Sequence, residues 1–174
     1  VAVLKDHLLL RTIGGYARFL SDDFNKTRFG FYGTVLSGTP EQPARWKRGS
    51  DLIKDELGED IGRAYVAKYF PPEAKAAADE LVRNLIAAMG ERLRKLEWMA
   101  PETKEKALAK LATFRPKIGY PVKWRDYSKL VVKRDDLVGN VARANEFDFQ
   151  RDLDKLGKPV DRDEWFMTPM EINA

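Results

Sequence analysis

A single histidine and several pairs of adjacent carboxylates are the residues best suited to acid–base or metal chemistry in this sequence. His7 is the only histidine and cysteine is absent, so a zinc site of the usual histidine-rich kind cannot be built from this chain alone. A Ser-His-Asp triad is also disfavoured, because His7 lies in what is predicted to be an ordinary helical face. The residues themselves therefore indicate no self-contained hydrolytic centre.

The paired carboxylates are interpreted as surface residues. Most lie in helical segments among Lys and Arg, where a spacing of four residues gives solvated ion pairs worth roughly a few tenths of a kcal/mol. No Walker lysine and no Gly-x-Gly-x-x-Gly pattern accompanies the glycines, so no phosphate-binding loop is expected. The carboxylate pairs are Asp22-Asp23, Asp55-Glu56, Glu59-Asp60, Asp135-Asp136 and Asp163-Glu164, with Asp161 beside the last.

Composition predicts a globular domain with a mixed surface. The 174 residues are 44% hydrophobic and 33% charged, which is sufficient for a core. The 31 basic and 27 acidic residues are interleaved, so the net charge of +4 gives no basic tract, and a nucleic-acid binder is the weakest of the functional alternatives. The aromatic residues are expected to anchor loops on a helical core. No apolar run approaches the roughly 18 residues that a membrane span requires.

Apolar residues recur with helical spacing along most of the chain, which predicts a mainly α fold. Glycine- and proline-rich stretches at residues 29–49 and 115–132 are expected to be irregular, the second with at most one short strand. An N-terminal helix is weakened by the Gly14-Gly15 pair. The predicted helices cover residues 4–20, 50–69 and 73–97, the segment that begins at Pro101, and a segment from Asp135 or Asp136 to Leu156.

The last eight residues alternate as a strand would. Thr168, Met170 and Ile172 would point to one face, and Met167, Glu171 and Asn173 to the other. The N-terminus likewise has the pattern of a helix entered partway through. Both ends therefore suggest an excerpt from a longer protein.

Three long stretches resemble the neprilysin and endothelin-converting-enzyme family of zinc metallopeptidases, especially its bacterial oligopeptidase members. They run from residue 29 to 75, from 96 to 130 and from 156 to the end, so the resemblance covers nearly the whole chain. Gly49 replaces a cysteine of the animal members, which fits a bacterial protein without disulfides. The matching residues are Phe31-Tyr32-Gly33, Gly38, Arg45-Trp46, Leu57-Gly58, Gly62, Tyr65-Val66, Tyr69-Phe70-Pro71, Trp98-Met99, Glu102-Thr103-Lys104, Ala107 and Ile118-Gly119-Tyr120-Pro121.

The resemblance implies a domain division and a substrate site. Residues 1–160 would form the later part of a multi-helix lid domain that closes over a chamber. Residues 161–174 would begin the thermolysin-like catalytic domain with its substrate edge strand, along which a peptide lies by β-augmentation. Asn173 would hold the substrate backbone through its side-chain amide, which donates and accepts at once, and Ala174 would offer its carbonyl.

The resemblance also implies an activity for the full-length protein. That protein would be a zinc-dependent metalloendopeptidase with one catalytic ion, which cleaves peptides by zinc-activated water. The family's H-E-x-x-H motif is not in this chain, so no catalytic or metal-binding residue is expected in it and it should be inactive alone. Its partners would be peptide substrates and the remainder of the polypeptide. The alternative is a non-catalytic helical interaction module. Localisation stays open, with the periplasm or the extracellular space preferred to the cytoplasm.

Overall fold

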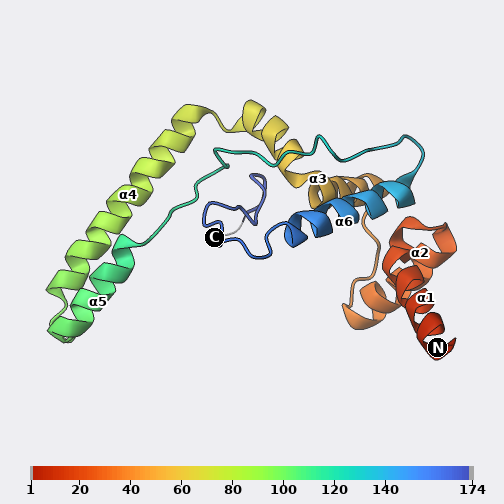
Figure 1. Ribbon diagram of the computed structural model, residues 1–174, viewed down its shortest axis with the longest axis horizontal. Coiled ribbons are helices and arrows are strands. Elements are labelled where there is room, and N and C mark those ends of the chain that lie inside the picture. The colour runs from red at the N-terminus through yellow and green to blue at the C-terminus, as the bar shows by residue number, and fades with distance from the viewer. Residues whose placement is uncertain (1, 173–174) are drawn as a thin grey trace. The chain divides into compact units, whose positions relative to one another are not determined.

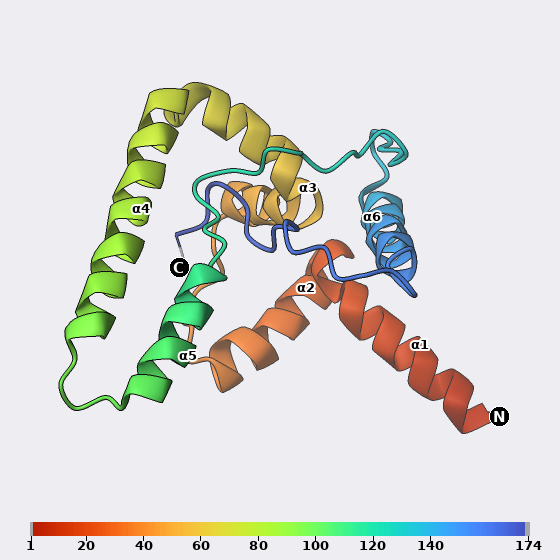
Figure 2. The same ribbon diagram turned by 60° about the vertical axis from the view of Figure 1, so that its left-hand side comes forward.

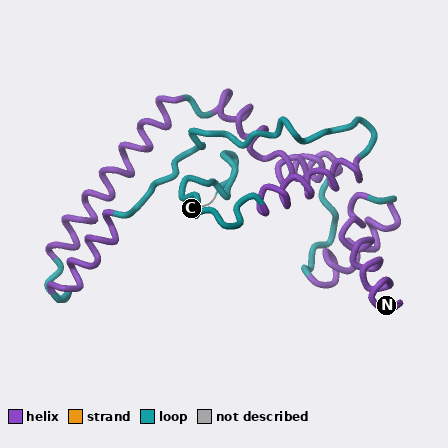
Figure 3. The backbone as a smooth tube through the Cα atoms, viewed as in Figure 1, coloured by secondary structure: helices purple, strands orange, loops and turns teal. Residues whose placement is uncertain are grey.

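The chain is mainly α-helical, as the sequence predicts (Figure 1). The computed structural model describes residues 2–172, and within that range helices alternate with loops and no strand is present (Figure 3). A short 3-10 helix η1 (Ala17–Phe19) and a π-helix η2 (Gly30–Leu36) supplement the α-helices. The α-helices are α1 (Ala2–Tyr16), α2 (Asp22–Phe29), α3 (Arg45–Tyr69), α4 (Pro72–Lys95), α5 (Pro101–Ala112) and α6 (Leu137–Leu153).

The chain is divided into two compact units, and one boundary between them lies at a kink in α3. Unit 1 comprises Val1–Glu56 and Asp126–Asp161, and unit 2 comprises Leu57–Arg125 and Arg162–Ala174. Leu57 has φ −129° and ψ 31°, which interrupts the helical backbone. Helix α3 therefore consists of two helical stretches, one belonging to each unit.

Unit 1 has a small core to which α6 contributes most. Ala17, Val141 and Ala144 retain 6%, 4% and 4% of their accessible surface. Asn25 is also buried, and the Nε2 of Gln42 donates a hydrogen bond to its Oδ1 at 2.9 Å. The one buried polar side chain among residues 2–172 therefore has a partner, which avoids the cost of an unpaired buried amide.

The start of α6 is fixed by Asp136, in agreement with the predicted N-cap. Its Oδ1 accepts a hydrogen bond from the backbone N–H of Gly139 at 3.1 Å, and its Oδ2 lies 3.0 Å from an Nη2 of Arg143. This guanidinium, together with the Gly139 N–H, holds the pKa of the Asp136 carboxyl below its ordinary value. Folding favours the ionised form, so this contribution to stability is present at neutral pH and is lost as pH falls below about 4.

The two roles of Asp136 can be separated by substitution. Asp136→Ala removes both cap and charge, and we expect the melting temperature at pH 7 to fall by about 2 to 4 °C. Asp136→Asn keeps a capping oxygen and removes only the charge, so its smaller deficit at pH 7 should vanish as the solution is acidified towards about pH 2. Thermal unfolding followed by circular dichroism across this pH range measures the melting temperatures of both variants. If the melting temperature of Asp136→Asn changed with pH in the same way as that of the wild type, the ion pair between Asp136 and Arg143 would not contribute to stability.

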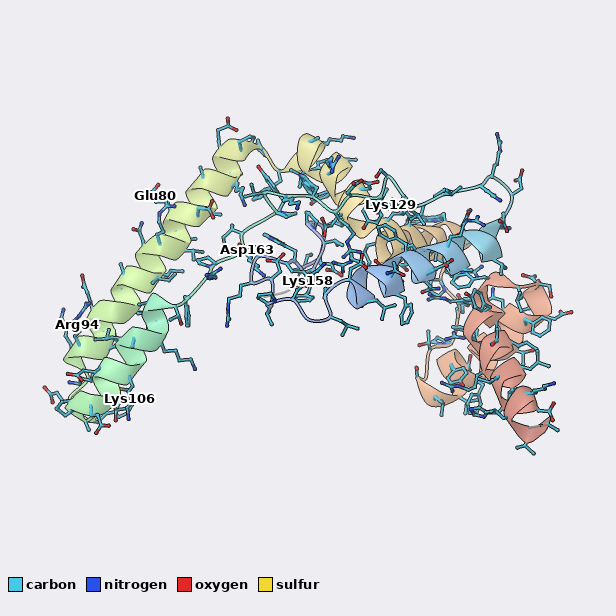
Figure 4. The ribbon with its side chains drawn as sticks, viewed as in Figure 1. Glu80, Arg94, Lys106, Lys129, Lys158 and Asp163 are labelled. Carbon is cyan, nitrogen blue, oxygen red and sulfur yellow. The ribbon has the colours of Figure 1, made fainter. Side chains whose placement is uncertain are left out.

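In unit 2, α4 and α5 lie side by side and are joined by a short connection (Figures 1 and 2). Each helix begins with a proline in its first turn, Pro72 and Pro101, where the missing N–H needs no partner. Charged side chains such as Glu80, Arg94 and Lys106 extend into solvent from this pair (Figure 4). The predicted bounds of both helices agree with the structure to within a few residues.

The segment after α5 is attached to the start of α4 at residues 118–120. The Nζ of Lys75 donates hydrogen bonds to the carbonyl oxygens of Ile118 and of Tyr120, the second at 3.0 Å. The same ammonium group lies 4.6 Å from the centre of the Tyr120 ring. Gly119 has φ +73° and lies against the ring of Phe70, so that no side chain fits there.

The irregular stretch predicted over residues 29–49 was wrong in part. Residues 30–36 form the π-helix η2, and residues 45–49 belong to α3. The apolar faces of α3 and α4 remain partly open, since Ile53 retains 45%, Leu85 60% and Met89 50% of the accessible surface. An amphipathic helix buries its apolar face only where another element packs against it, and within residues 2–172 these three side chains are only partly covered. None of the helices in this range is long and apolar enough to cross a membrane.

Candidate functional site

The segment that leads to Asn173 is a turn. The backbone N–H of Glu171 donates to the carbonyl oxygen of Thr168 at 3.0 Å, and the Oε2 of Glu171 accepts from the backbone N–H of Thr168 at 2.7 Å. The strand predicted from Met167 onward is therefore not found over residues 167–172, because a strand needs a neighbouring strand for its hydrogen bonds and none exists in the described range. Asn173 and Ala174, the predicted substrate-binding residues, lie outside the described residues.

This turn packs directly on the backbone of α3. Gly58 and Gly62 are buried and lie one helical turn apart on the same face. A Cβ atom at Gly62 would lie 2.6 Å from Cδ of Pro169, and one at Gly58 would overlap with Cγ2 of Thr168. The two glycines thus leave the space that the side chains of residues 168 and 169 occupy.

A second attachment holds residues 163 and 164. The Nζ of Lys117 donates to the carbonyl oxygen of Glu164, and an Nη1 of Arg115 lies 3.6 Å from an Oδ1 of Asp163. Both residues of the Arg115–Asp163 pair are well exposed, so this pair adds little to stability. Together the two contacts nevertheless hold residues 163 and 164, which precede the turn, against the loop that follows α5.

Aromatic side chains support the same region. The rings of Tyr120 and Trp124 are stacked with centroids 6.0 Å apart, and the guanidinium of Arg63 lies 5.6 Å from the Trp124 ring. Trp124 therefore anchors its loop on α3, as predicted for the aromatic residues. Trp46 and Trp98 do not, because 69% and 77% of their surfaces are exposed.

The surface interpretation of the carboxylates holds for some pairs and fails for others. Asp22 pairs with Lys26 at 3.0 Å, and both side chains are more than two-thirds exposed, as expected. Glu59, however, has a side chain only 12% exposed, and its Oε2 accepts the backbone N–H of Arg125 at 2.6 Å. Glu56 is also partly buried, and this burial raises the pKa of its carboxyl, an effect that Arg18 opposes. Both glutamates lie next to the α3 kink, which periodicity does not reveal.

Removing the Glu59 carboxylate should destabilise unit 2. Glu59→Ala leaves the Arg125 N–H without this acceptor, and we expect the free energy of unfolding to fall by about 1 to 3 kcal/mol. Glu102→Ala is the matched control, because Glu102 forms an ion pair with Lys106 in which both side chains are more than three-quarters exposed. That change should cost less than about 1 kcal/mol. Urea unfolding measures both, and equal losses for the two variants would refute the assigned role of Glu59.

An apolar groove of about 610 Å³ lies along α4, α5 and the loop that follows. Leu85, Met89 and Phe114 are among its lining residues, and Arg115 is the one charged side chain that contributes. Such a lining can contact apolar groups, but it has no carboxylate, histidine or cysteine with which to perform acid–base or nucleophilic chemistry.

The described residues do not fit a catalytic zinc ion. Among residues 2–172 no group of three or more His, Cys, Asp or Glu side chains is arranged to hold a metal. His7 is exposed on α1, as the sequence predicts for an ordinary helical face.

Comparison with known proteins decides the family. A model of peptidase family M13 matches residues 1–121. The chain belongs to peptidase family M13. The neutral endopeptidase of Lactobacillus helveticus is 34% identical over 98% of this chain and 26% of its own length, and neprilysin-2 of Drosophila melanogaster is 32% identical over 99% and 25%. The predicted resemblance to neprilysins is confirmed.

Solved structures of similar proteins share the fold. The zinc metalloprotease Zmp1 of Mycobacterium tuberculosis in its open state is 48% identical, with a TM-score of 0.82 over 94% of this chain and 25% of that one. PepO of Lactobacillus rhamnosis is 33% identical, with a TM-score of 0.76 over 90% and 25%. The M13 chain described here thus spans about a quarter of the length of the relatives that it matches.

Proposed function

We propose that this chain is the non-catalytic, lid-forming part of a zinc-dependent metalloendopeptidase that hydrolyses peptides. The observation that carries the proposal is the match to family M13 together with 48% identity to a zinc metalloprotease along 94% of the chain. The single histidine and the lack of cysteine mean that zinc would be held by residues outside this chain. The chain alone would then be inactive.

Within the full-length enzyme, residues 1–160 would wall a chamber that admits only peptides. Residues 161–174 would lead into the catalytic domain, where Asn173 and Ala174 would hold the substrate backbone. The turn at residues 168–171 supports this arrangement, because it is fixed on α3 and ends two residues before Asn173.

The remainder of the same polypeptide would be the principal partner of this chain. Large apolar side chains are exposed along α4, with Leu81 and Leu85 at 60% and Met89 at 50%. Contiguous apolar surface of this kind marks an interaction face. Since the relatives are about four times as long, their additional sequence is the natural cover for it.

The lid role predicts that substrates are selected by size. The full-length enzyme should cleave a short fluorogenic peptide and leave the same sequence uncut when it is placed in an exposed loop of a folded protein. A protease with an open site, run in parallel, should cleave both and so show that the loop is accessible. Comparable cleavage of the two substrates by the full-length enzyme would exclude a size-selecting chamber.

The non-catalytic interaction module is the competing function, and the apolar groove along α4 is the observation that favours it. The coding sequence downstream of Ala174 separates the two. An H-E-x-x-H motif there supports the peptidase, because two histidines one helical turn apart bind zinc on one face. A stop codon in its place would support the module.

A further inference from the structure

The apolar groove of unit 2 combines partly buried side chains with large exposed ones. Leu85, Met89 and Phe114 retain 60%, 50% and 57% of their accessible surface. Leu85 and Met89 are four residues apart and therefore lie on the same face of α4. An apolar surface of this kind, with open side chains next to covered ones, is typical of a place where a further element packs. The partly buried members of the lining include Val82, Ile86 and Leu111.

We propose that this groove holds an amphipathic α-helix from the part of the full-length polypeptide outside residues 1–174. That helix lies along α4 and α5, which are side by side in Figures 1 and 2, and adds a third helix to the pair. The inference rests on the proposed function, which makes the remainder of the polypeptide the partner of this chain. It adds which surface is covered and what kind of element covers it.

The lining of the groove suits apolar side chains and not a small polar ligand. Among the lining residues only Thr113 and Arg115 have polar side chains, and Arg115 already pairs with Asp163. Sites for small molecules place several polar groups where they fix the orientation of the ligand. The groove therefore selects for apolar surface and for no particular functional group.

The element in the groove must satisfy its own backbone hydrogen bonds. Backbone groups inside α4 and α5 are used within those helices, and no strand among residues 2–172 offers a free edge. An extended segment would lose the bonds of its covered backbone groups to water, whereas a helix makes these bonds internally. A helix with apolar residues at spacings of three, four and seven also presents a continuous apolar edge to such a groove.

The same polypeptide is a better source of this helix than a second molecule. The chain spans 26% and 25% of two of its relatives, so about three-quarters of each relative lies outside the matched part. A segment joined to the groove by the chain acts at an effective concentration on the order of millimolar. Docking within one molecule would therefore fill the groove before a second molecule binds.

Cysteine labelling of the full-length protein tests whether the groove is covered. Leu85→Cys should react with a maleimide at least about 10-fold more slowly than Asn84→Cys, with both rates read from the peptide that contains the new cysteine. Residue 84 is the matched control, because it adjoins residue 85 in α4 and is exposed. Residues 1–174 contain no native cysteine. Equal labelling rates would overturn the inference.

Photo-cross-linking identifies the element that covers the groove. Benzoylphenylalanine in place of Leu85 should give a cross-link within one molecule, to a segment outside residues 1–174 whose apolar residues recur with helical spacing. A cross-link to a second molecule of the protein would overturn the inference in favour of a dimer. A cross-link to a segment without that spacing would overturn the assignment of a helix.

Peptidase activity of the full-length protein separates this inference from the proposed function. If the protein lacked metal-dependent peptidase activity but residue 85 were protected and cross-linked as expected, the proposed function would fall and the groove assignment would stand. If an active peptidase labelled equally fast at residues 84 and 85, only the groove assignment would fall. The labelling result holds even if the benzoylphenylalanine variant does not fold.

Discussion

Replacement of Asn173 by alanine in the proposed full-length peptidase should lower kcat/KM on short peptides by about 10- to 100-fold. In the proposed function the Asn173 amide donates to and accepts from the substrate backbone, and alanine leaves both backbone groups unpaired in the closed site. Because the contact is with backbone, the loss should be similar for peptides of different sequence. Steady-state hydrolysis of several fluorogenic peptides measures this.

Asn84→Ala is a suitable control for that experiment. Asn84 is exposed on α4, so its replacement should leave kcat/KM unchanged. If Asn173→Ala retained full activity on every peptide, the substrate-binding role given to this residue would have to be withdrawn. A loss confined to one peptide sequence would indicate recognition of a side chain instead.

Replacement of Gly119 should have the largest effect on stability. Gly119 has φ +73°, which costs a residue with a side chain about 1 to 2 kcal/mol. An alanine Cβ would also overlap with the ring of Phe70, which packs edge-on against Tyr120 at 5.7 Å between centroids. Together these predict that Gly119→Ala lowers the free energy of unfolding by about 2 to 4 kcal/mol. Urea unfolding and amide hydrogen exchange at residues 118–120 in the full-length protein measure the loss.

Substitution of Gly38 separates the cost of the positive φ from the cost of the overlap with Phe70. It has φ +67°, but an added Cβ there meets nothing within 4 Å. Gly38→Ala should therefore show the backbone cost alone, about 1 to 2 kcal/mol. An equal loss at both positions would mean that the overlap with Phe70 is relieved at no cost and that the contact does not constrain the segment.

The helices could be predicted because their signals are local. Pro72 and Pro101 mark the starts of α4 and α5, and Asp136 caps α6, each as expected. The π-helix at Gly30–Leu36 could not be predicted, because glycines and aromatic residues in that stretch are equally typical of a loop. The kink at Leu57 was missed for the opposite reason, since the apolar repeat continues through it without interruption.

The candidate site depends on contacts between residues far apart in the sequence, and periodicity carries no information about these. The resemblance pointed to Gly58 and Gly62 as family residues, but only the structure shows Thr168 and Pro169 lying on them. Glu59 illustrates the same limit, because its spacing suggests a surface pair and its partner Arg125 is 66 residues away. The identity of the peptide-holding residues rests on resemblance, as Asn173 and Ala174 lie outside the described range.

The proposed function is tested most directly by comparing zinc-dependent hydrolysis by the full-length protein and by residues 1–174, with zinc content measured in both. The full-length protein should bind one zinc ion, cleave a short peptide, lose that activity with a chelator and regain it when zinc is added. Residues 1–174 should bind no stoichiometric zinc and cleave nothing. Metal-dependent cleavage by residues 1–174, or a zinc-loaded full-length protein that cleaves no peptide, would contradict the proposed function.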